Sequence, residues 1–306
     1  MAEARDGPRL MVCRRRLLSE SLFVVLFSAL LFAGLGQYAL WDDEANTALF
    51  ARSLWHSGDL EAFDGRNVIA YSQGFELTET RNRQIPPLQY VLAAPFAALE
   101  DASTFVVRLP FALCGTCLAL LVCAGLRRAK MSLLHSAMLW LLILGNVSLI
   151  LYLRQARYYA PAIVLTVAIA YLYATRSARW RSVIVLGLCG GALFLTHYLA
   201  YVSLVGALGV DYLLWGRRER RVPWSHIGAL VASQLTVIAL YVVLWEPTFR
   251  RPSNYQAKDV LVDKLKLLWW NLRDFNACEF SPVWVLLAAP VIYFATRGRD
   301  PWLMRA

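Results

Sequence analysis

Apolar stretches of about membrane-spanning length recur along nearly the whole chain, and short clusters of arginine and lysine border most of them. A transmembrane helix needs about 20 predominantly apolar residues, and the stretch 17–40 already supplies that length. Of the 306 residues, 58% are hydrophobic and only 17% are charged, which excludes an ordinary soluble domain of this size. The sequence therefore predicts an all-α polytopic membrane protein, with residues 1–306 forming one membrane domain.

The basic clusters predict how the chain is threaded through the bilayer. They are Arg14–Arg16, Arg127–Arg128 with Lys130, Arg176 with Arg179 and Arg181, and Arg217–Arg218 with Arg220–Arg221. Cytoplasmic loops carry an excess of Lys and Arg, so we place these clusters and both chain ends in the cytoplasm. The formal charge of +10 is then explained by the basic clusters that mark the cytoplasmic side of the membrane. A nucleic-acid partner is not expected, because the clusters do not share one soluble face.

About eight transmembrane helices satisfy every basic cluster. The first (17–40) leads outward into a long first extracytoplasmic loop (41–103) with juxtamembrane helices. The apolar segment 86–99 belongs to this loop, because its roughly 14 residues reach only about 21 Å and the hydrocarbon core is about 30 Å thick. The other predicted segments are spans at 104–126, 131–151, 158–175 and 226–245, a hairpin of two shorter spans at 182–215, a second extracytoplasmic loop at 246–282 with a surface helix at 260–272, and a last span at 283–296.

An acidic patch, formed by Asp42, Asp43 and Glu44, follows the first span on the predicted outer face. Carboxylates are poor neighbours for anionic lipid headgroups, but they suit a reaction that needs a base at the membrane surface. They also suit a helix N-terminus, where carboxylates accept orphan N–H bonds and favour the helix dipole. The two roles are compatible, since a capping carboxylate can still accept a proton.

Basic side chains share the same predicted face. They are Arg83 before the paired prolines, Arg108 at the end of the second span, Arg154 and Arg157 between the third and fourth spans, and His197 at the tip of the hairpin. Guanidinium groups match phosphate oxygens, and paired arginines on the outer side run against the positive-inside bias. They indicate an anion such as a lipid phosphate. The alternatives are snorkelling for Arg154 and Arg157, a helix end for Arg108, and a hydrogen-bonded interface residue for His197.

A carboxylate, several arginines and a membrane surface together suggest a substrate with a lipid tail, a phosphate and a transferable group. The carboxylate would deprotonate an acceptor hydroxyl, and the arginines would stabilise the departing phosphate. The cysteines do not predict a disulfide framework, because four of the six lie inside predicted spans. The CxxC spacing of Cys114 and Cys117 fits close helix approach better than redox or zinc chemistry.

At these residues the chain resembles the GT-C superfamily of membrane glycosyltransferases, in particular bacterial relatives of protein O-mannosyltransferases and lipid A aminoarabinose transferases. Five segments carry the resemblance in family order: 43–45 with 49–54, 86–90, 108–113, 154–160 and 195–198. The resemblance spans about residues 17–215. It implies a GT-C-like bundle, a polyprenyl-phosphate-linked sugar donor, and inverting transfer outside the cytoplasmic membrane.

The resemblance also implies roles for individual residues. It makes Asp43 the catalytic base, with Glu44 or Asp42 assisting. The expected donor-phosphate contacts are Arg154, Arg157, Arg108 and Tyr158, and the expected secondary residues are His197 and Arg83. The cofactor is left unknown, with a divalent metal as an open alternative. Gln84 and Ile85 stand where relatives often carry an acidic residue or a histidine, which weakens a metal site shared with His197.

The expected function is a glycosyltransferase that moves a sugar from a polyprenyl-phosphate donor to a hydroxyl of a glycan, lipid or protein acceptor. An alternative is a catalytically impaired relative that binds polyprenyl phosphate or a partner protein, suggested by Gln84 and by a chain shorter than many relatives. A transporter is a weaker alternative, because transporters place polar groups at mid-membrane, whereas here the polar groups crowd at one face.

Overall fold

The structure is a computed structural model that describes residues 7–63, 83, 85–99, 102–177, 179–216, 222–247, 262, 265–266 and 269–270. The elements of this part of the chain are helices joined by turns, without a β-strand among the described residues. The predicted all-α fold is therefore confirmed there. The predicted last span, at 283–296, lies outside the described residues, as does most of the predicted second loop at 246–282.

The chain divides into two compact units, one of residues 1–25, 123–151 and 250–306, the other of residues 26–122 and 152–249. In the first unit, Glu20 is buried on helix α1 (Gly7–Phe32). Its carboxylate accepts hydrogen bonds from Nε of Arg16, at 2.8 Å, and from Nε of Arg127. Both arginines belong to predicted cytoplasmic clusters. Their positive charges therefore also neutralise the buried carboxylate of Glu20.

Two described helical segments are long and apolar enough to cross a membrane: α4 (Thr104–Arg128), and α11 (Trp224–Leu240) with its π-helical end η4 (Tyr241–Trp245). A third is added if α5 (Leu133–Leu144) and α6 (Val147–Arg154), which meet at a bend of 63°, form one broken span. The eight-span topology remains a prediction.

Two predicted spans differ from the structure in their course. The stretch 131–151 was predicted as one helix, but a second helix begins after Asn146, whose Oδ1 accepts the backbone N–H of Leu149 at 3.0 Å. This side chain supplies an N-cap and so favours a new helix start. The stretch 17–40 is helical only to Phe32, and Gly34 then adopts a positive φ of 62°, a conformation that glycine tolerates and that ends the helix.

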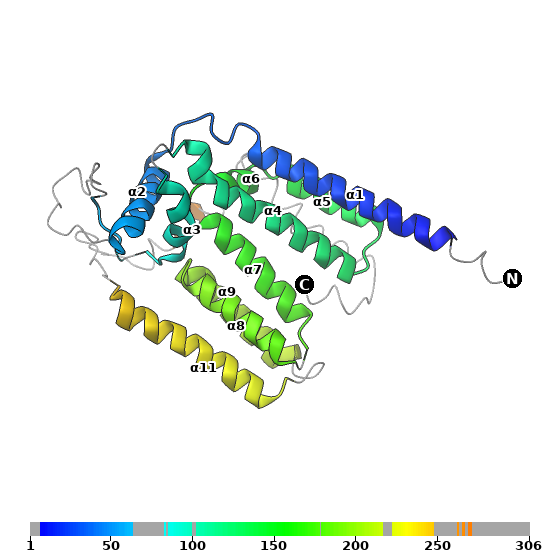
Figure 1. Ribbon diagram of the computed structural model, residues 1–306. Coiled ribbons are helices and arrows are strands. Elements are labelled where there is room, and N and C mark those ends of the chain that lie inside the picture. The colour runs from blue at the N-terminus through cyan, green and yellow to red at the C-terminus, as the bar shows by residue number, and fades with distance from the viewer. Residues whose placement is uncertain are drawn as a thin grey trace. The chain divides into compact units, whose positions relative to one another are not determined.

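The second unit holds four neighbouring apolar helices: α7 (Tyr159–Ala174), α8 (Trp180–Phe194), α9 (Tyr198–Asp211), which continues as η3 (Tyr212–Gly216), and α11 (Figure 1). Helix α8 approaches α11 closely because its contact face carries glycines. A Cβ added to Gly190 would lie 2.8 Å from Oε1 of Gln234, and Nε2 of Gln234 donates to the Gly187 carbonyl at 2.9 Å. Such small-residue contacts are typical of membrane helix pairs.

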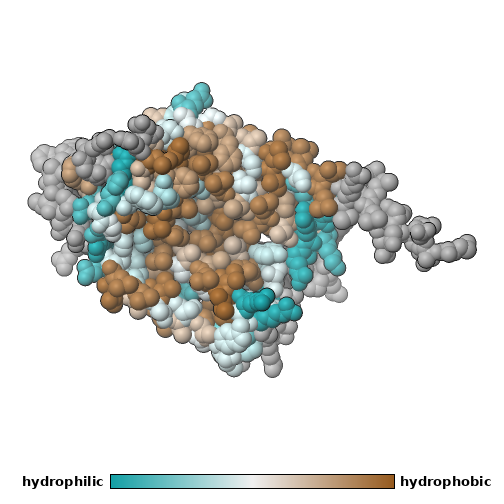
Figure 2. Space-filling view, viewed as in Figure 1, coloured by the Kyte–Doolittle hydropathy of each residue, from teal (hydrophilic) through white to brown (hydrophobic). Residues whose placement is uncertain are grey.

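Hydrophobic residues cover much of the surface that Figure 2 shows. On the segment 224–245 the large exposed side chains include Val231, Leu235, Val243 and Leu244. An exposed apolar surface of this extent is unfavourable in water but matches the hydrocarbon core of a bilayer. The described part of the chain thus carries the lipid-compatible surface expected of a membrane protein.

Two helices of the second unit, α2 (Asp42–Ser57) and α3 (Leu88–Ala97), precede these four in the sequence and lie side by side (Figure 1). The rings of Phe50 and Tyr90 meet edge to face at 5.6 Å, and Nε of Arg52 donates to the Ala97 carbonyl at 3.0 Å. The N–H of Leu88 donates to the Leu195 carbonyl at 2.9 Å. The start of α3 is therefore fixed beside the turn that carries His197.

Candidate active site

The three carboxylates of the acidic patch occupy the first turn of α2 in different environments. Asp42 is exposed, the Asp43 side chain is 43% exposed, and the Glu44 side chain is fully buried. Successive residues of an α-helix point in directions about 100° apart, so adjacent carboxylates reach different neighbours. Asp43 is the member of the patch that is both held by a partner and open to solvent.

The buried carboxylate of Glu44 accepts four hydrogen bonds. Its Oε1 accepts from Nε of Arg108 at 2.9 Å and from the backbone N–H of Ala156 at 2.8 Å. Its Oε2 accepts from Nη2 of Arg108 at 2.5 Å and from the backbone N–H of Trp41 at 3.4 Å. Because a carboxylate offers about four acceptor sites, Glu44 is saturated by the protein. We had expected it to assist the base, but this geometry favours a structural role.

Arg108 completes the same network from α4. Besides Glu44, its guanidinium donates to the carbonyls of Leu35 and Tyr38, both at 3.0 Å, and of Ala39 at 3.1 Å. All five N–H donors of the guanidinium are thus used within the protein. Arg108 was expected to contact donor phosphate, yet this arrangement leaves it no donor to offer. It instead ties the chain after α1 to the start of α2.

Arg157 has a different environment. Its Nη1 donates to Oδ2 of Asp43 at 2.6 Å, and its Cζ lies within 5.3–5.7 Å of the ring centroids of Trp41, Tyr158 and Tyr159. Cation–π attraction at such distances holds a guanidinium without using its N–H donors. Within the described part of the chain the other N–H donors of Arg157 have no acceptor, so they are available to an anion.

Arg154 and His197 each have a defined partner. Nη2 of Arg154 donates to the Ala33 carbonyl at 2.7 Å. The ring of His197 stacks on Tyr158 at 4.6 Å, and its Nδ1 accepts the backbone N–H of Ala200 at 3.1 Å as the N-cap of α9. Burial lowers the pKa of His197 below 6.5, which favours the neutral ring that this cap needs. The geometry supports the interpretation of His197 as a hydrogen-bonded histidine.

A metal ligand set does not emerge from the described residues, because no group of three or more His, Cys, Asp or Glu side chains is placed to hold an ion there. The predicted alternative of a divalent metal stays untested. Cys114 and Cys117 are free thiols on α4. A Cβ added to the intervening Gly115 would lie 2.5 Å from a methyl carbon of Leu31, which fits the expected close helix approach.

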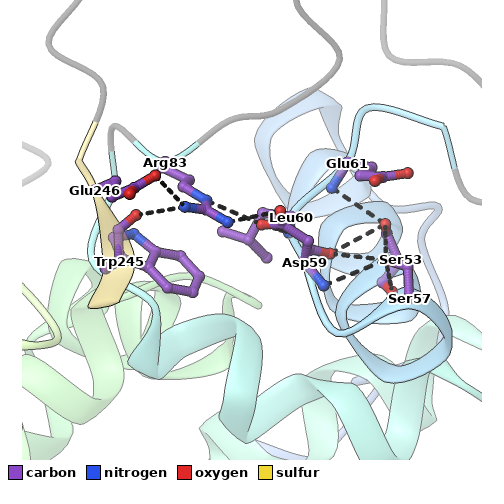
Figure 3. Close-up of polar contacts among 8 residues, drawn as sticks. All are labelled: Ser53, Ser57, Asp59, Leu60, Glu61, Arg83, Trp245 and Glu246. Carbon is purple, nitrogen blue, oxygen red and sulfur yellow. Dashed lines mark hydrogen bonds and ion pairs between the residues drawn. The ribbon is translucent and has the colours of Figure 1, made fainter. Parts of the chain in front are cut away.

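Arg83, a predicted secondary residue, belongs to a separate cluster with Asp59 and Trp245 (Figure 3). The sequence does not predict the contacts of Asp59, of the Trp41 ring or of the backbone N–H of Ala156. For Asp59 the one sequence hint is its place directly after Gly58, which ends α2. The contact made by Ala156 involves backbone only and therefore has no residue-type signature.

Comparison with known proteins identified a family. A family model described as dolichyl-phosphate-mannose-protein mannosyltransferase matches residues 84–245, just over half of the chain. Neither the curated proteins nor the solved structures contained a match. The matched region includes Arg108, Arg154, Arg157 and His197, whereas the acidic patch precedes it.

Proposed function

The chain belongs to the dolichyl-phosphate-mannose-protein mannosyltransferase family and is a membrane glycosyltransferase of the GT-C type; on this basis we propose that it transfers a sugar from a polyprenyl-phosphate donor to an acceptor hydroxyl. The observation that carries the proposal is the ion pair of Asp43 and Arg157. These residues are 114 positions apart in the sequence, and their side chains meet at 2.6 Å in a partly exposed place. A proton acceptor thus lies beside a phosphate-matching donor.

Asp43 acts as the general base. Its carboxylate takes the proton from the acceptor hydroxyl, whose oxygen then attacks the anomeric carbon of the sugar. The bond between that carbon and the phosphate oxygen breaks, and polyprenyl phosphate departs with the bonding electrons. Solvent exposure of 43% lets an acceptor reach Asp43, while the saturated carboxylate of Glu44 is out of reach.

Arg157 binds the donor phosphate and stabilises the charge that develops on it as the bond breaks. The three rings around its guanidinium fix its position and leave donors for phosphate oxygens. Tyr158 contributes as one of these rings. Arg154 adds positive charge nearby, although one of its donors is engaged by Ala33.

Phosphate binding also changes the state of the base. In the structure the Asp43 carboxylate is held by Arg157. A bound phosphate competes for the same guanidinium, which weakens its hold on Asp43 and frees the carboxylate to accept a proton. Donor binding and activation of the base are therefore coupled through one arginine.

Glu44 and Arg108 form the framework of this site. Their buried pair joins the start of α2 to the segment 154–157 through the N–H of Ala156. Asp43 directly precedes Glu44, and Arg157 directly follows Ala156. The framework therefore sets the distance between Asp43 and Arg157. This framework role belongs to the buried Glu44, whereas the partly exposed Asp43 faces the substrate.

Sidedness and acceptor complete the proposal. The basic clusters support a site outside the inner, or cytoplasmic, membrane, with both chain ends in the cytoplasm. The family description suggests mannose as the sugar and a protein hydroxyl as the acceptor, and glycan or lipid hydroxyls fit the same chemistry. The lipid tail of the donor would stay in the bilayer.

The proposal is tested by reconstituting the purified full chain in vesicles with labelled polyprenyl-phosphate mannose and a mixture of peptide, glycan and lipid acceptors. We expect label on one acceptor class and release of polyprenyl phosphate. A nucleotide-linked mannose serves as the control donor and should transfer no label. If a range of polyprenyl-phosphate sugars binds without any transfer, the catalytically impaired alternative is correct.

A further inference from the structure

Arg83 lies at the centre of a polar cluster that joins three segments of the second unit (Figure 3). It binds the Asp59 carboxylate with two parallel bonds, from Nε to Oδ1 at 3.1 Å and from Nη2 to Oδ2 at 2.7 Å. Its Nη1 donates to the Trp245 carbonyl at 3.0 Å and lies 3.5 Å from Oε2 of Glu246. The Arg83 and Asp59 side chains are only 16% and 12% exposed, so this pair is held largely out of water.

Asp59 is itself fixed to the last turn of α2. It follows Gly58, the left-handed C-cap of the helix. The hydroxyls of Ser53 and Ser57 donate to its carbonyl at 3.2 and 3.3 Å, and the N–H of Leu60 donates to its Oδ1 at 2.8 Å (Figure 3). A partner that binds the Asp59 carboxylate therefore also restrains the end of α2.

Helix α2 is held at both ends by a carboxylate–arginine pair. At its start the buried Glu44 binds Arg108, and just past its end Asp59 binds Arg83. Both pairs are bidentate, a geometry that the planar guanidinium provides and an ammonium does not. Because a helix is a stiff rod, the two attachments fix its direction, and Asp43 lies in its first turn.

We propose that Arg83 is a positioning residue: by linking Asp59 to Trp245 it fixes the end of α2 against the end of η4 and so orients Asp43 toward Arg157. Its role in catalysis rests on the proposed function, in which Asp43 is the base. In this proposal Arg83 does not touch substrate, because three of its N–H donors are bonded to protein oxygens and its guanidinium also pairs with Glu246. Its contribution is geometric.

The geometric claim is tested without any activity assay. Spin labels are attached to the exposed positions His56→Cys on α2 and Val243→Cys on η4, in full-length protein whose native cysteines are replaced. We expect one narrow distance with Arg83 intact, and a broad distribution in Arg83→Gln and Asp59→Asn. Arg83→Lys keeps the charge but loses the bidentate bond, so the width of its distance distribution should be intermediate. This variant provides a second measurement if Arg83→Gln does not fold. The control is Glu246→Gln, since this carboxylate is 77% exposed; its distance should stay narrow.

Sugar transfer by the same Arg83 variants, without labels, tests the catalytic consequence. We expect kcat to fall by about 10- to 100-fold, the range for a small misplacement of a catalytic group, with donor KM changed less than about twofold because Arg157 is untouched. Narrow distances in both Arg83→Gln and Asp59→Asn, or broadened distances with unchanged kcat, would overturn the proposal. If the unmutated chain transfers no sugar, the proposed function fails, and the spin-label distances still decide whether Arg83 fixes α2.

Discussion

The carboxylate of Asp43 and the guanidinium of Arg157 form a hydrogen-bonded ion pair at 2.6 Å, and the described residues saturate neither group. The adjacent pair of Glu44 and Arg108 has the opposite character, with every acceptor and donor in use. The two neighbouring carboxylates thus have different roles: Glu44 stabilises the site, and Asp43 faces the substrate.

Asp43→Asn should bind polyprenyl phosphate more tightly than the unmutated chain. The substitution removes the carboxylate that competes with phosphate for Arg157. A partly exposed ion pair contributes about 0.5–1 kcal/mol, so the affinity should rise by about two- to fivefold. Titration of the chain in lipid nanodiscs measures this change, with the exposed neighbour Asp42→Asn as the control. An affinity lower than that of the unmutated chain would contradict the competition.

Arg157→Gln should weaken binding of polyprenyl phosphate by about tenfold or more, since hydrogen bonds to charged groups contribute about 1.5–3 kcal/mol. Arg157→Lys should recover part of the loss because it restores the charge without the planar fork. Arg154→Gln is the matched comparison and should have a smaller effect, because Arg154 is bonded to the Ala33 carbonyl whereas Arg157 is bonded to Asp43, the proposed base. Equal losses at both positions in the same titration would show that charge alone matters.

The sequence allowed parts of the fold to be predicted because length and capping are local properties. The short apolar segment 86–99 was predicted not to span the bilayer, and α3 extends over only Leu88–Ala97. The span predicted at 104–126 begins where α4 begins, at Thr104. The bend after α5 was missed, because Asn146 acts as a cap only once its side chain turns toward Leu149.

The sequence did not allow us to predict which arginine of the candidate site pairs with which carboxylate. The acidic patch and the arginines were identified as one group, but no pattern tells which arginine meets which carboxylate. Burial decides this: Glu44 faces the interior and takes Arg108, while Asp43 takes Arg157. Arg83 is a predicted secondary residue of the site, and its pairing with Asp59 was missed for the same reason, since Asp59 carries no motif.

Glu44→Gln should destabilise the folded protein, whereas Asp43→Asn should not. Breaking a buried ion pair leaves an uncompensated charge, here on Arg108, and costs about 3–5 kcal/mol. The exposed pair of Asp43 contributes much less, because water screens it. Thermal unfolding in detergent should show a clearly lowered Tm for Glu44→Gln only. Equal Tm values for the two variants would mean that the Glu44–Arg108 pair is not the framework of the site.

The His197 cap predicts that stability declines as the pH falls below about 6.5. Burial lowers the pKa of His197 from 6.5, so below that pH the unfolded chain binds more protons than the folded one, and stability falls with pH. Protonation of Nδ1 also removes the acceptor for the N–H of Ala200. Tm measured from pH 8 to pH 5 should decrease less in His197→Asn, because asparagine also caps helices but does not titrate. An unchanged pH dependence in that variant would exclude His197 as its source.

The most direct test of the account is a single-turnover assay of sugar transfer with donor-saturated Asp43→Asn, beside Asp42→Asn and the unmutated chain. Saturation with donor separates the chemical step from binding. We expect Asp43→Asn to bind the donor yet lose at least about a hundredfold in rate, in line with the removal of a general base, while Asp42→Asn stays near the unmutated rate. Transfer by Asp43→Asn at the unmutated rate would contradict the central claim that the carboxylate paired with Arg157 accepts the proton.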